Sequence, residues 1–234
     1  MKYFSIIVFS ITLFFALNLT VYSAFELAIE AELAHKIVPP ITIGVPADAK
    51  AKGGPQPDEP SNGKFIWIPG APTSSGQDNQ GYIEFEITIP KKAKYAIWGR
   101  VIAWDGNSDS FWVIWRPADP DENPQQVQKQ DYRWAVAQGN TWHWNRVNKW
   151  LDAGTFNREW ELDKGDTVLR IYGREDATML DCIFITDNLG ADAGAVGARV
   201  PTKEEINAWI QGKQKLAVVS KDKLPTTWAS IKSF

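Results

Sequence analysis

Three carboxylates stand where a carboxylate is costly unless a cation lies close by. Glu30 and Glu32 alternate with apolar residues near the start of the chain, and alternation in a β-strand would place both on one face, where they repel each other. Asp181 stands inside the apolar run of residues 180–185, where burial penalises the charged form. One calcium ion, which accepts several carboxylate oxygens in flexible geometry, could hold Glu30, Glu32 and Asp181 together. The alternative is that all three lie on solvated faces.

The tryptophans are the second group of residues with possible chemistry. Ten of the twelve lie within residues 67–160, and the densest group contains Trp142 and Trp144. In a strand these two would share one face, and His143 would lie on the other. This is more indole than one core needs, and a flat indole stacks readily on the C–H face of a pyranose ring. We therefore expect some rings to contact a saccharide; the alternative is that Trp142 and Trp144 face the core.

Polar residues beside the loops would complete such a site, because carboxylate, hydroxyl and guanidinium groups hydrogen-bond sugar hydroxyls. Trp104 and Asp109 flank one loop. Arg174 opens another, where its planar fork could hold the carboxylate of an acidic sugar or could simply pair with Glu175. The candidate ligand-binding residues are Trp104, Asp109, Ser110, Trp142, Trp144 and Arg174. Three other tryptophans lie within strand-like runs and are expected to pack against the protein: Trp98, Trp112 and Trp160.

These residues need a β scaffold, and the chain has strand patterns separated by turn signals. The run Tyr82–Ile89 alternates polar and apolar residues and is stopped by Pro90, which is typical of a half-buried antiparallel strand. Since no helical period separates the strands, we predict an all-β fold, a jelly-roll β-sandwich with a short, partly helical C-terminal tail. Further strands are expected over residues 95–104, 111–115, 167–172 and 180–186.

Two long segments interrupt the strands and are expected to be surface loops that bury little. Residues 47–62 are rich in Gly, Pro, Lys and Asp, and residues 117–131 are rich in Pro, Asp and Gln. The second segment leads into the tryptophan-rich region, so it could form one wall of a binding cleft.

The N-terminus indicates export. One Lys precedes an uncharged run, and small or short residues follow at the positions that a signal peptidase reads, so residues 1–23 are predicted to be a signal peptide cleaved after Ser23. The alternative is an uncleaved anchor. Cleavage would leave a mature protein without a membrane span, secreted or at the cell surface.

Composition narrows the function classes. The chain has a formal net charge of −3 and no basic stripe, so a nucleic-acid partner is not expected. A single Cys182, in an apolar run, excludes an internal disulfide and is expected to be buried. A small exported domain without a disulfide needs another brace, and a metal ion is the obvious candidate.

The sandwich is expected to span residues 24–187, followed by a linker and tail over residues 188–234. Residues 188–200 are mostly small, as in a linker, and Thr202 and Glu205 have the spacing of a helix capping box. The tail could pack back on the sandwich or attach the protein to a partner in the cell envelope, and the sequence does not decide between the two.

The chain resembles carbohydrate-binding modules of families six, thirty-five and thirty-six. The resemblance covers roughly residues 30–187 and rests on six segments in the family's order, which are Glu30–Glu32, Gly63–Ile66, Gly81–Phe85, Ala93–Val101, Gly165–Ile171 and Leu180–Ile183. It implies a jelly-roll sandwich with a structural calcium bound by Glu30, Glu32 and Asp181, with backbone carbonyls from Ser61 and Lys64. The insertion over residues 47–62 departs from the family just before those carbonyls.

The predicted function is non-catalytic binding of a polysaccharide or other glycan. A glycoside hydrolase needs two carboxylates set across a cleft, and the outstanding pair, Glu30 and Glu32, suits a metal better. His35 and His143, the two histidines, stand in no recognisable catalytic pattern, and the usual hydrolase and phosphate-loop motifs are absent from the sequence. The alternatives are a structural or adhesion protein of the cell envelope and, less favoured, a polysaccharide lyase or hydrolase.

Overall fold

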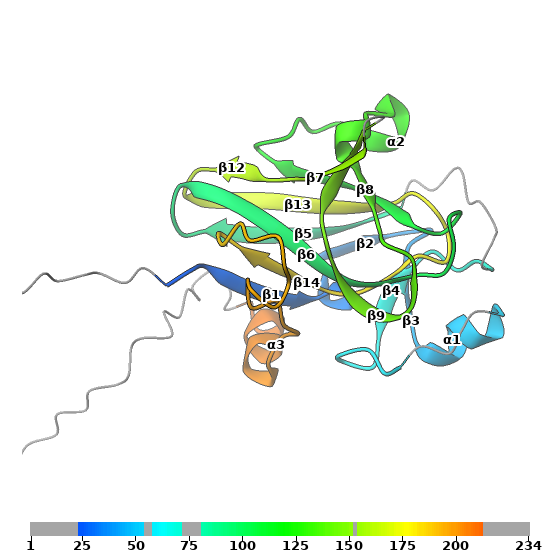
Figure 1. Ribbon diagram of the computed structural model, residues 1–234. Coiled ribbons are helices and arrows are strands. Elements are labelled where there is room, and N and C mark those ends of the chain that lie inside the picture. The colour runs from blue at the N-terminus through cyan, green and yellow to red at the C-terminus, as the bar shows by residue number, and fades with distance from the viewer. Residues whose placement is uncertain (1–22, 54–57, 72–80, 152–153, 213–234) are drawn as a thin grey trace, which may run out of the picture.

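The computed structural model describes residues 23–53, 58–71, 81–151 and 154–212. The chain forms two antiparallel sheets packed face to face, with a separate two-stranded hairpin (Figure 1). The all-β sandwich predicted from the sequence is therefore confirmed. Residues 1–22 of the predicted signal peptide and residues 213–234 of the predicted tail lie outside the described residues.

The larger sheet has the strand order β12-β6-β14-β4-β3, with β1 also paired to β14 and β9 paired to β6. Its strands are β1 (Glu26–Glu30), β3 (Thr42–Gly44), β4 (Phe65–Trp67), β6 (Ala93–Ala103), β9 (Gly139–Arg146), β12 (Trp160–Leu162) and β14 (Met179–Thr186).

The smaller sheet has the order β2-β5-β13-β7-β8, and the hairpin joins β10 to β11. The strands of the sheet are β2 (Lys36–Val38), β5 (Tyr82–Ile89), β7 (Ser110–Arg116), β8 (Arg133–Ala135) and β13 (Gly165–Gly173). Those of the hairpin are β10 (Asn148–Leu151) and β11 (Gly154–Asn157).

The core lies between the inner faces of the two sheets and follows directly from strand alternation. On β5, Ile83, Phe85, Ile87 and Ile89 are all buried, while the residues between them point outward. β6 contributes Tyr95, Ile97 and Val101 from the facing sheet. Cys182 is buried as a free thiol, as expected. The bounds of β5 match the predicted strand, and the other predicted strands differ from the observed ones by at most two residues at either end.

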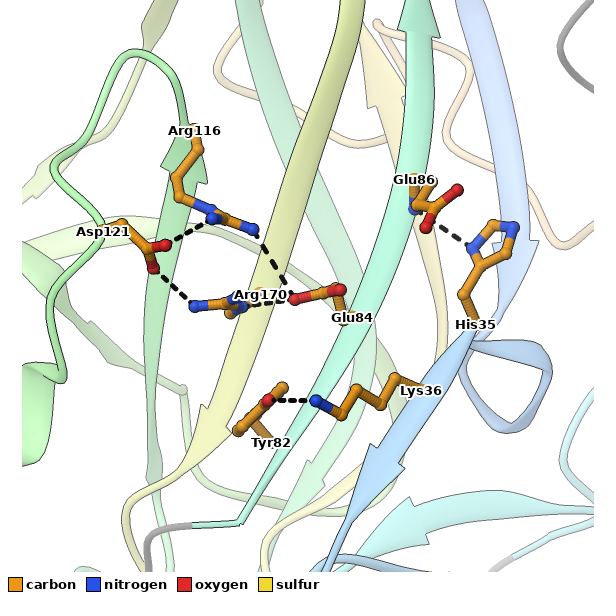
Figure 2. Close-up of polar contacts among 8 residues, drawn as sticks. All are labelled: His35, Lys36, Tyr82, Glu84, Glu86, Arg116, Asp121 and Arg170. Carbon is orange, nitrogen blue, oxygen red and sulfur yellow. Dashed lines mark hydrogen bonds and ion pairs between the residues drawn. The ribbon is translucent and has the colours of Figure 1, made fainter.

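The outward face of the smaller sheet is held by a network of charged side chains (Figure 2). Arg170 on β13 lies between Glu84 on β5 and Asp121, and its Nη1 is 2.6 Å from Asp121 Oδ1. Arg116 on β7 contacts the same two acids, at 2.5 Å from Asp121 and 3.7 Å from Glu84. Two cations and two anions thus satisfy one another on this face.

The first predicted strand ends earlier than expected. Ile29 to Glu32 were expected to form one continuous strand, but β1 stops at Glu30, and Ala31–Leu33 form the 3-10 turn η1. The reason is topological, because the chain leaves the larger sheet after β1 and enters the smaller sheet as β2. A turn is needed where the chain crosses between the layers.

The two long segments bury few of their described residues, as expected, and each contains a short helix. The first contains the helix α1 (Pro46–Ala51), whose Ala49 is buried against Phe65 and Trp67 on the outer face of the larger sheet. The second contains α2 (Pro124–Val127) and runs into the 3-10 turn η2 (Gln130–Tyr132), whose last residue, Tyr132, follows the segment and is only 1% exposed. Among the described residues of 47–62 and 117–131, the buried ones are Ala49, Pro60 and Pro124, so the prediction that both segments bury little is confirmed.

The described part of the C-terminal segment packs back on the sandwich. In residues 188–200, Val196 is buried with Trp98 and Phe184, and Arg146 donates to the carbonyls of Leu189 and Gly190 at 2.9 and 2.8 Å. This stretch is therefore a cover for the larger sheet rather than a free linker.

The helix α3 (Lys203–Ile210) begins with the predicted capping box, in which the Thr202 hydroxyl accepts a hydrogen bond from the Glu205 amide. Its Trp209 is 8% exposed, donates from Nε1 to the carbonyl of Leu33 at 2.6 Å, and contacts the rings of His35 and Phe85. Each helix in the described part of the chain falls short of the length and hydrophobicity that a bilayer-spanning helix needs.

Replacing Trp209 should therefore undock α3. We expect Trp209→Ala to lower the free energy of unfolding by about 3 kcal/mol, because it removes a buried aromatic and leaves a cavity. The neighbouring Ile210 is 64% exposed, so Ile210→Ala should change stability by less than about 0.5 kcal/mol. Urea unfolding measures both variants, and equal effects would contradict the docked position of the helix.

Candidate functional site

The three predicted metal-binding carboxylates come together beside the loop that precedes β4. Glu30 ends β1, Glu32 lies on η1 and Asp181 lies on β14, and their exposed fractions are 1, 6 and 0%. Ser61 links two of them, with its amide donating to Asp181 Oδ1 at 2.9 Å and its hydroxyl donating to Glu30 Oε2 at 2.6 Å. Asn62 donates to Glu32 Oε1 at 2.8 Å. The alternative of three solvated faces is excluded.

Two oxygens of this cluster lack a partner among the described residues, namely Glu30 Oε1 and Glu32 Oε2. Burial raises the pKa of Glu30 to about 8, and the negative charges of Glu32 and Asp181 add to the effect. Burial also raises the pKa of Glu32. Burial raises the pKa of Asp181 too, but its oxygens have partners, because Arg100 donates to Oδ2 at 2.5 Å and Ser61 donates to Oδ1. The cluster is therefore short of positive charge at Glu30 and Glu32.

The donor set suits a hard cation. Its free atoms are carboxylate oxygens, which are the ligands that calcium accepts. No group of three or more His, Cys, Asp or Glu side chains in the described segments is arranged to hold a metal unaided. The residues that could hold one are Glu30 and Glu32 through their free oxygens, supplemented by backbone carbonyls of the adjoining loop, with Asp181 alongside.

The tryptophans divide clearly by exposure. Of the eleven tryptophans within the described residues, seven are buried: Trp67, Trp98, Trp112, Trp115, Trp134, Trp160 and Trp209. Four are half-buried: Trp104, Trp142, Trp144 and Trp150. The expected packing of Trp98, Trp112 and Trp160 is confirmed, and three of the four half-buried rings are predicted ligand-binding residues.

Trp142 and Trp144 lie on the outer face of the larger sheet, so the alternative in which they face the core is excluded. Asn145, on the opposite alternation of β9, points inward and accepts a hydrogen bond from the core residue Trp134 at 2.6 Å. Trp142 packs beside Phe65, with ring centroids 5.8 Å apart. Its Nε1 donates to the carbonyl of Asp58 at 2.7 Å. The indole is therefore held in place while the residue remains half-buried.

Trp142 and Trp144 belong to two different side-chain clusters on the outer face of the larger sheet. Trp142 joins Trp104 on a cluster built from Phe65, Trp67, Ile102 and Met179. Trp144 joins a different cluster, with Trp98 and Phe184, that the segment around Val196 covers. Arg100, opposite Trp144 in register, reaches over the Trp142 ring at 5.5 Å from its centroid. Sequence reasoning missed Arg100 as a partner of this ring, although its alternation with Trp98 and Ile102 on β6 places it on the same face.

The loop that joins β6 to β7 holds an unusual group of polar atoms. Buried atoms without a hydrogen-bond partner in the described ranges include Trp104 Nε1, Asp105 Oδ2, Ser108 Oγ, Asp109 Oδ1 and Thr178 Oγ1. Thr178 belongs with the loop because the next residue, Met179, pairs with Ile102 near the end of β6. Buried polar groups are normally satisfied, and each one left unpaired costs about 1–3 kcal/mol. These donors and acceptors have capacity for a ligand that carries hydroxyl groups.

Glu175 organises the remaining predicted residues. Its Oε2 accepts hydrogen bonds from the Asp109 amide at 3.0 Å and from the Ser110 hydroxyl at 2.6 Å. Arg174 pairs with Glu175, donates to Ser110 Oγ at 2.7 Å and stacks over Trp112. Of the two roles considered for Arg174, the structure therefore shows the ion pair with Glu175. The positive charge of Arg174 is not free to bind the carboxylate of an acidic sugar.

Five of the six predicted ligand-binding residues thus lie at one end of the sandwich. Trp104 and Asp109 bound the β6–β7 loop, Ser110 begins β7, Arg174 follows β13, and Trp142 is three residues from Gly139, the partner of Ala103. Trp144 lies apart from them.

Comparison with solved structures finds carbohydrate-binding modules. A family 6 module at the C-terminus of LamC, a laminarinase of Zobellia galactanivorans, aligns with 14% identity and a TM-score of 0.43, over 69% of this chain and 99% of that one. A family 35 module of Clostridium thermocellum aligns with 12% identity and a TM-score of 0.43, over 70% of this chain and 98% of the other.

The family 35-containing mannanase of Podospora anserina aligns with 14% identity and a TM-score of 0.45, over 71% of this chain and 28% of that protein. No protein-family model matches the sequence, and no curated protein matches it. The structural neighbours are of the type that the sequence resembles.

The Asp109 carboxyl should give this site a measurable pH signature. Burial, followed by the negative charge of Glu175, raises the pKa of Asp109 from 3.8 to about 6. The protonated form therefore stabilises the fold at pH 4, and this contribution is lost as pH rises towards 6. We expect Asp109→Asn, which cannot ionise, to make the fall of Tm between pH 4 and 6 shallower. Asp163→Asn, at a carboxylate that is 78% exposed, should leave the slope unchanged, and an unchanged slope in Asp109→Asn would refute the burial of this charge.

Proposed function

We propose that this protein is a non-catalytic saccharide-binding module whose site lies at the β6–β7 end of the sandwich. The observation that carries the proposal is the coincidence of two half-buried indoles, Trp104 and Trp142, with unpaired buried donors and acceptors in the described loop after β6. Stacking rings and free hydrogen-bonding atoms are the two things that a sugar ring with hydroxyls on its rim requires.

Each group has a definite part in this proposal. The exposed part of the Trp142 face stacks on the C–H face of a pyranose, held by the Asp58 carbonyl. Trp104 Nε1 donates to a sugar hydroxyl, while Asp105 and Asp109 accept. Arg174 and Glu175 fix Ser110 and the backbone of Asp109 and bring no net charge, so an uncharged sugar is favoured over a uronate.

We also propose that a calcium ion occupies the carboxylate cluster and supports the saccharide site. Glu30 and Glu32 would supply their free oxygens. The cluster and the indole are joined, because Asp58 lies on the same loop as Ser61, and Arg100 contacts both Asp181 and the Trp142 ring. A cation that fixes this loop therefore also fixes the platform for the sugar.

Geometry supports the non-catalytic assignment. The acids nearest to the proposed sugar are Asp109 and Glu175, and their side chains interact directly with each other. Glycosidases keep their two carboxyl groups about 5–9.5 Å apart so that the sugar or a water fits between them. This pair leaves no such gap. A predicted signal peptide agrees with a glycan ligand that lies outside the cell, so we place the protein outside the cell or at its surface.

Removal of one indole should test the saccharide site. We expect Trp142→Ala to weaken saccharide binding, as reported by tryptophan fluorescence on a panel of soluble oligosaccharides, by tenfold or more, because about 1.4 kcal/mol of stacking is lost. Trp144→Ala is the matched control, two residues away on the same face but in a separate cluster, and it should retain the affinity. If neither the unaltered protein nor a variant responds to any saccharide, the result would instead favour a structural or adhesion function in the cell envelope.

Chelation should test the calcium site. We expect a chelator to lower Tm and added calcium to restore it, since an ion at 100 times its Kd stabilises the folded state by about 2.7 kcal/mol. Glu30→Gln should abolish the response, whereas Glu86→Gln, at an exposed position on β5, should preserve it. A melting curve that calcium leaves unchanged in the unaltered protein would refute the site, whatever the saccharide experiment shows.

A further inference from the structure

A cavity of about 360 Å³ lies at the other end of β7 from the proposed saccharide site. Its walls come from the segment after β7, from η2, from the β10–β11 hairpin and from the start of β12; they include Asp119, Asp131, Tyr132, Lys149, Arg158 and Trp160. This volume is at the lower end of the range for small-molecule sites. None of these residues belongs to the site proposed above.

The floor of the cavity is rigid and internally satisfied. Arg158 is 3% exposed and donates from Nη2 to Asp119 Oδ1 at 2.7 Å. Its guanidinium lies 4.6 Å from the Trp160 ring and 5.1 Å from the Tyr132 ring. Trp160 Nε1 donates to the other oxygen of Asp119 at 2.7 Å. A ligand would therefore meet a preformed surface and would not have to order it.

The rim carries charges of both signs. Lys149 Nζ is 3.9 Å from Asp131 Oδ1, which is longer than a hydrogen bond. A sugar hydroxyl can accept from the ammonium and donate to the carboxylate at once, so such a loose pair suits an uncharged hydroxylated ligand. The four acids among the lining residues outnumber the three cations, and this balance disfavours an anion; they are Asp119, Asp131, Glu159 and Glu161 against Lys129, Lys149 and Arg158.

An exposed aromatic ring stands beside this rim. Phe156 on β11 is 50% exposed, the one aromatic among the exposed large hydrophobic side chains of the described residues. It is the direct partner of Lys149 across the hairpin, and directly paired residues carry their side chains on the same face. Because Lys149 lines the cavity, the Phe156 side chain lies on the face of the hairpin that borders the cavity. An exposed ring next to a polar cavity is an arrangement for stacking a sugar.

We propose that this cavity is a second saccharide-binding site, which takes one uncharged sugar unit with Phe156 stacking on it or on its neighbour in the chain. Its ligand class rests on the proposed function, but its residues are separate from those of the first site. Two sites at opposite ends of β7 let one module bind two stretches of glycan, and the second binding event then gains from the first through effective concentration.

Calorimetric titration with neutral cello-, laminari-, manno- and galacto-oligosaccharides tests the proposal, with circular dichroism to confirm folding. We expect Trp142→Ala to keep one binding site, and adding Phe156→Ala to that variant to weaken the remaining site at least tenfold. Phe156→Tyr should retain it because the ring is kept, and Val127→Ala, at another exposed apolar position, should have no effect.

The outcomes separate the two proposals. If Trp142→Ala binds no neutral oligosaccharide with saturation, or if Phe156→Ala leaves its remaining binding intact, the second site is wrong whatever the first site does. If Phe156→Ala abolishes all binding and Trp142→Ala changes none, the cavity stands and the site at the β6–β7 loop falls. Equal affinity of the Trp142→Ala variant for neutral and uronate oligosaccharides would overturn the assignment of an uncharged ligand.

Discussion

The burial of three carboxylates where β1 leaves the larger sheet is the constraint on which the outer face around Trp142 depends. Glu30 and Glu32 are buried at the turn that carries the chain from one layer to the other, and Asp181 is buried beside them on β14. Ser61 and Asn62 hydrogen-bond to Glu30 and Glu32. Partly satisfied carboxylates cannot remain buried and charged without a counter-ion or protons. The same contacts tie down the loop of residues 58–62 and hence the indole that this loop holds, so the cluster and the ligand platform form one unit.

Polar side chains find hydrogen-bond and ion-pair partners to different degrees in different parts of the molecule. On the outer face of the smaller sheet, Arg116 and Arg170 share Glu84 and Asp121 (Figure 2). These ion pairs balance two cations against two anions and stabilise the sheet modestly, with Arg116 Nε the buried atom of the network that lacks a partner among the described residues. At the β6–β7 loop, by contrast, buried donors and acceptors within the described segments lack partners. These are the groups to which the proposed hydroxylated ligand would hydrogen-bond.

Local patterns in the sequence were enough for much of the scaffold. Strict alternation predicts β5 with its observed bounds, the Thr202–Glu205 spacing predicts the start of α3, and alternation alone places Trp142 and Trp144 on one face. What could not be predicted depends on contacts between distant residues. Trp144 is separated from Trp142 by the cover around Val196, and Glu175 gathers Asp109 and Ser110 from some 65 positions away. Neither contact leaves a periodic signal in the chain.

The two segments that look least structured in the sequence contribute to both proposed binding sites. Residues 58–62, at the end of the first, hold Trp142 and the carboxylate cluster, and residues 118–131 of the second build one wall of the cavity. The sheets beneath them supply rigid positions and little chemistry of their own, as is general for binding sites carried on loops. The departure from the family pattern at residues 47–62 therefore falls beside the proposed saccharide site, because Ala49 of α1 packs on the aromatic cluster that also contacts Trp104 and Trp142. A change of glycan preference in this fold requires a change in such covers and leaves the core between the sheets intact.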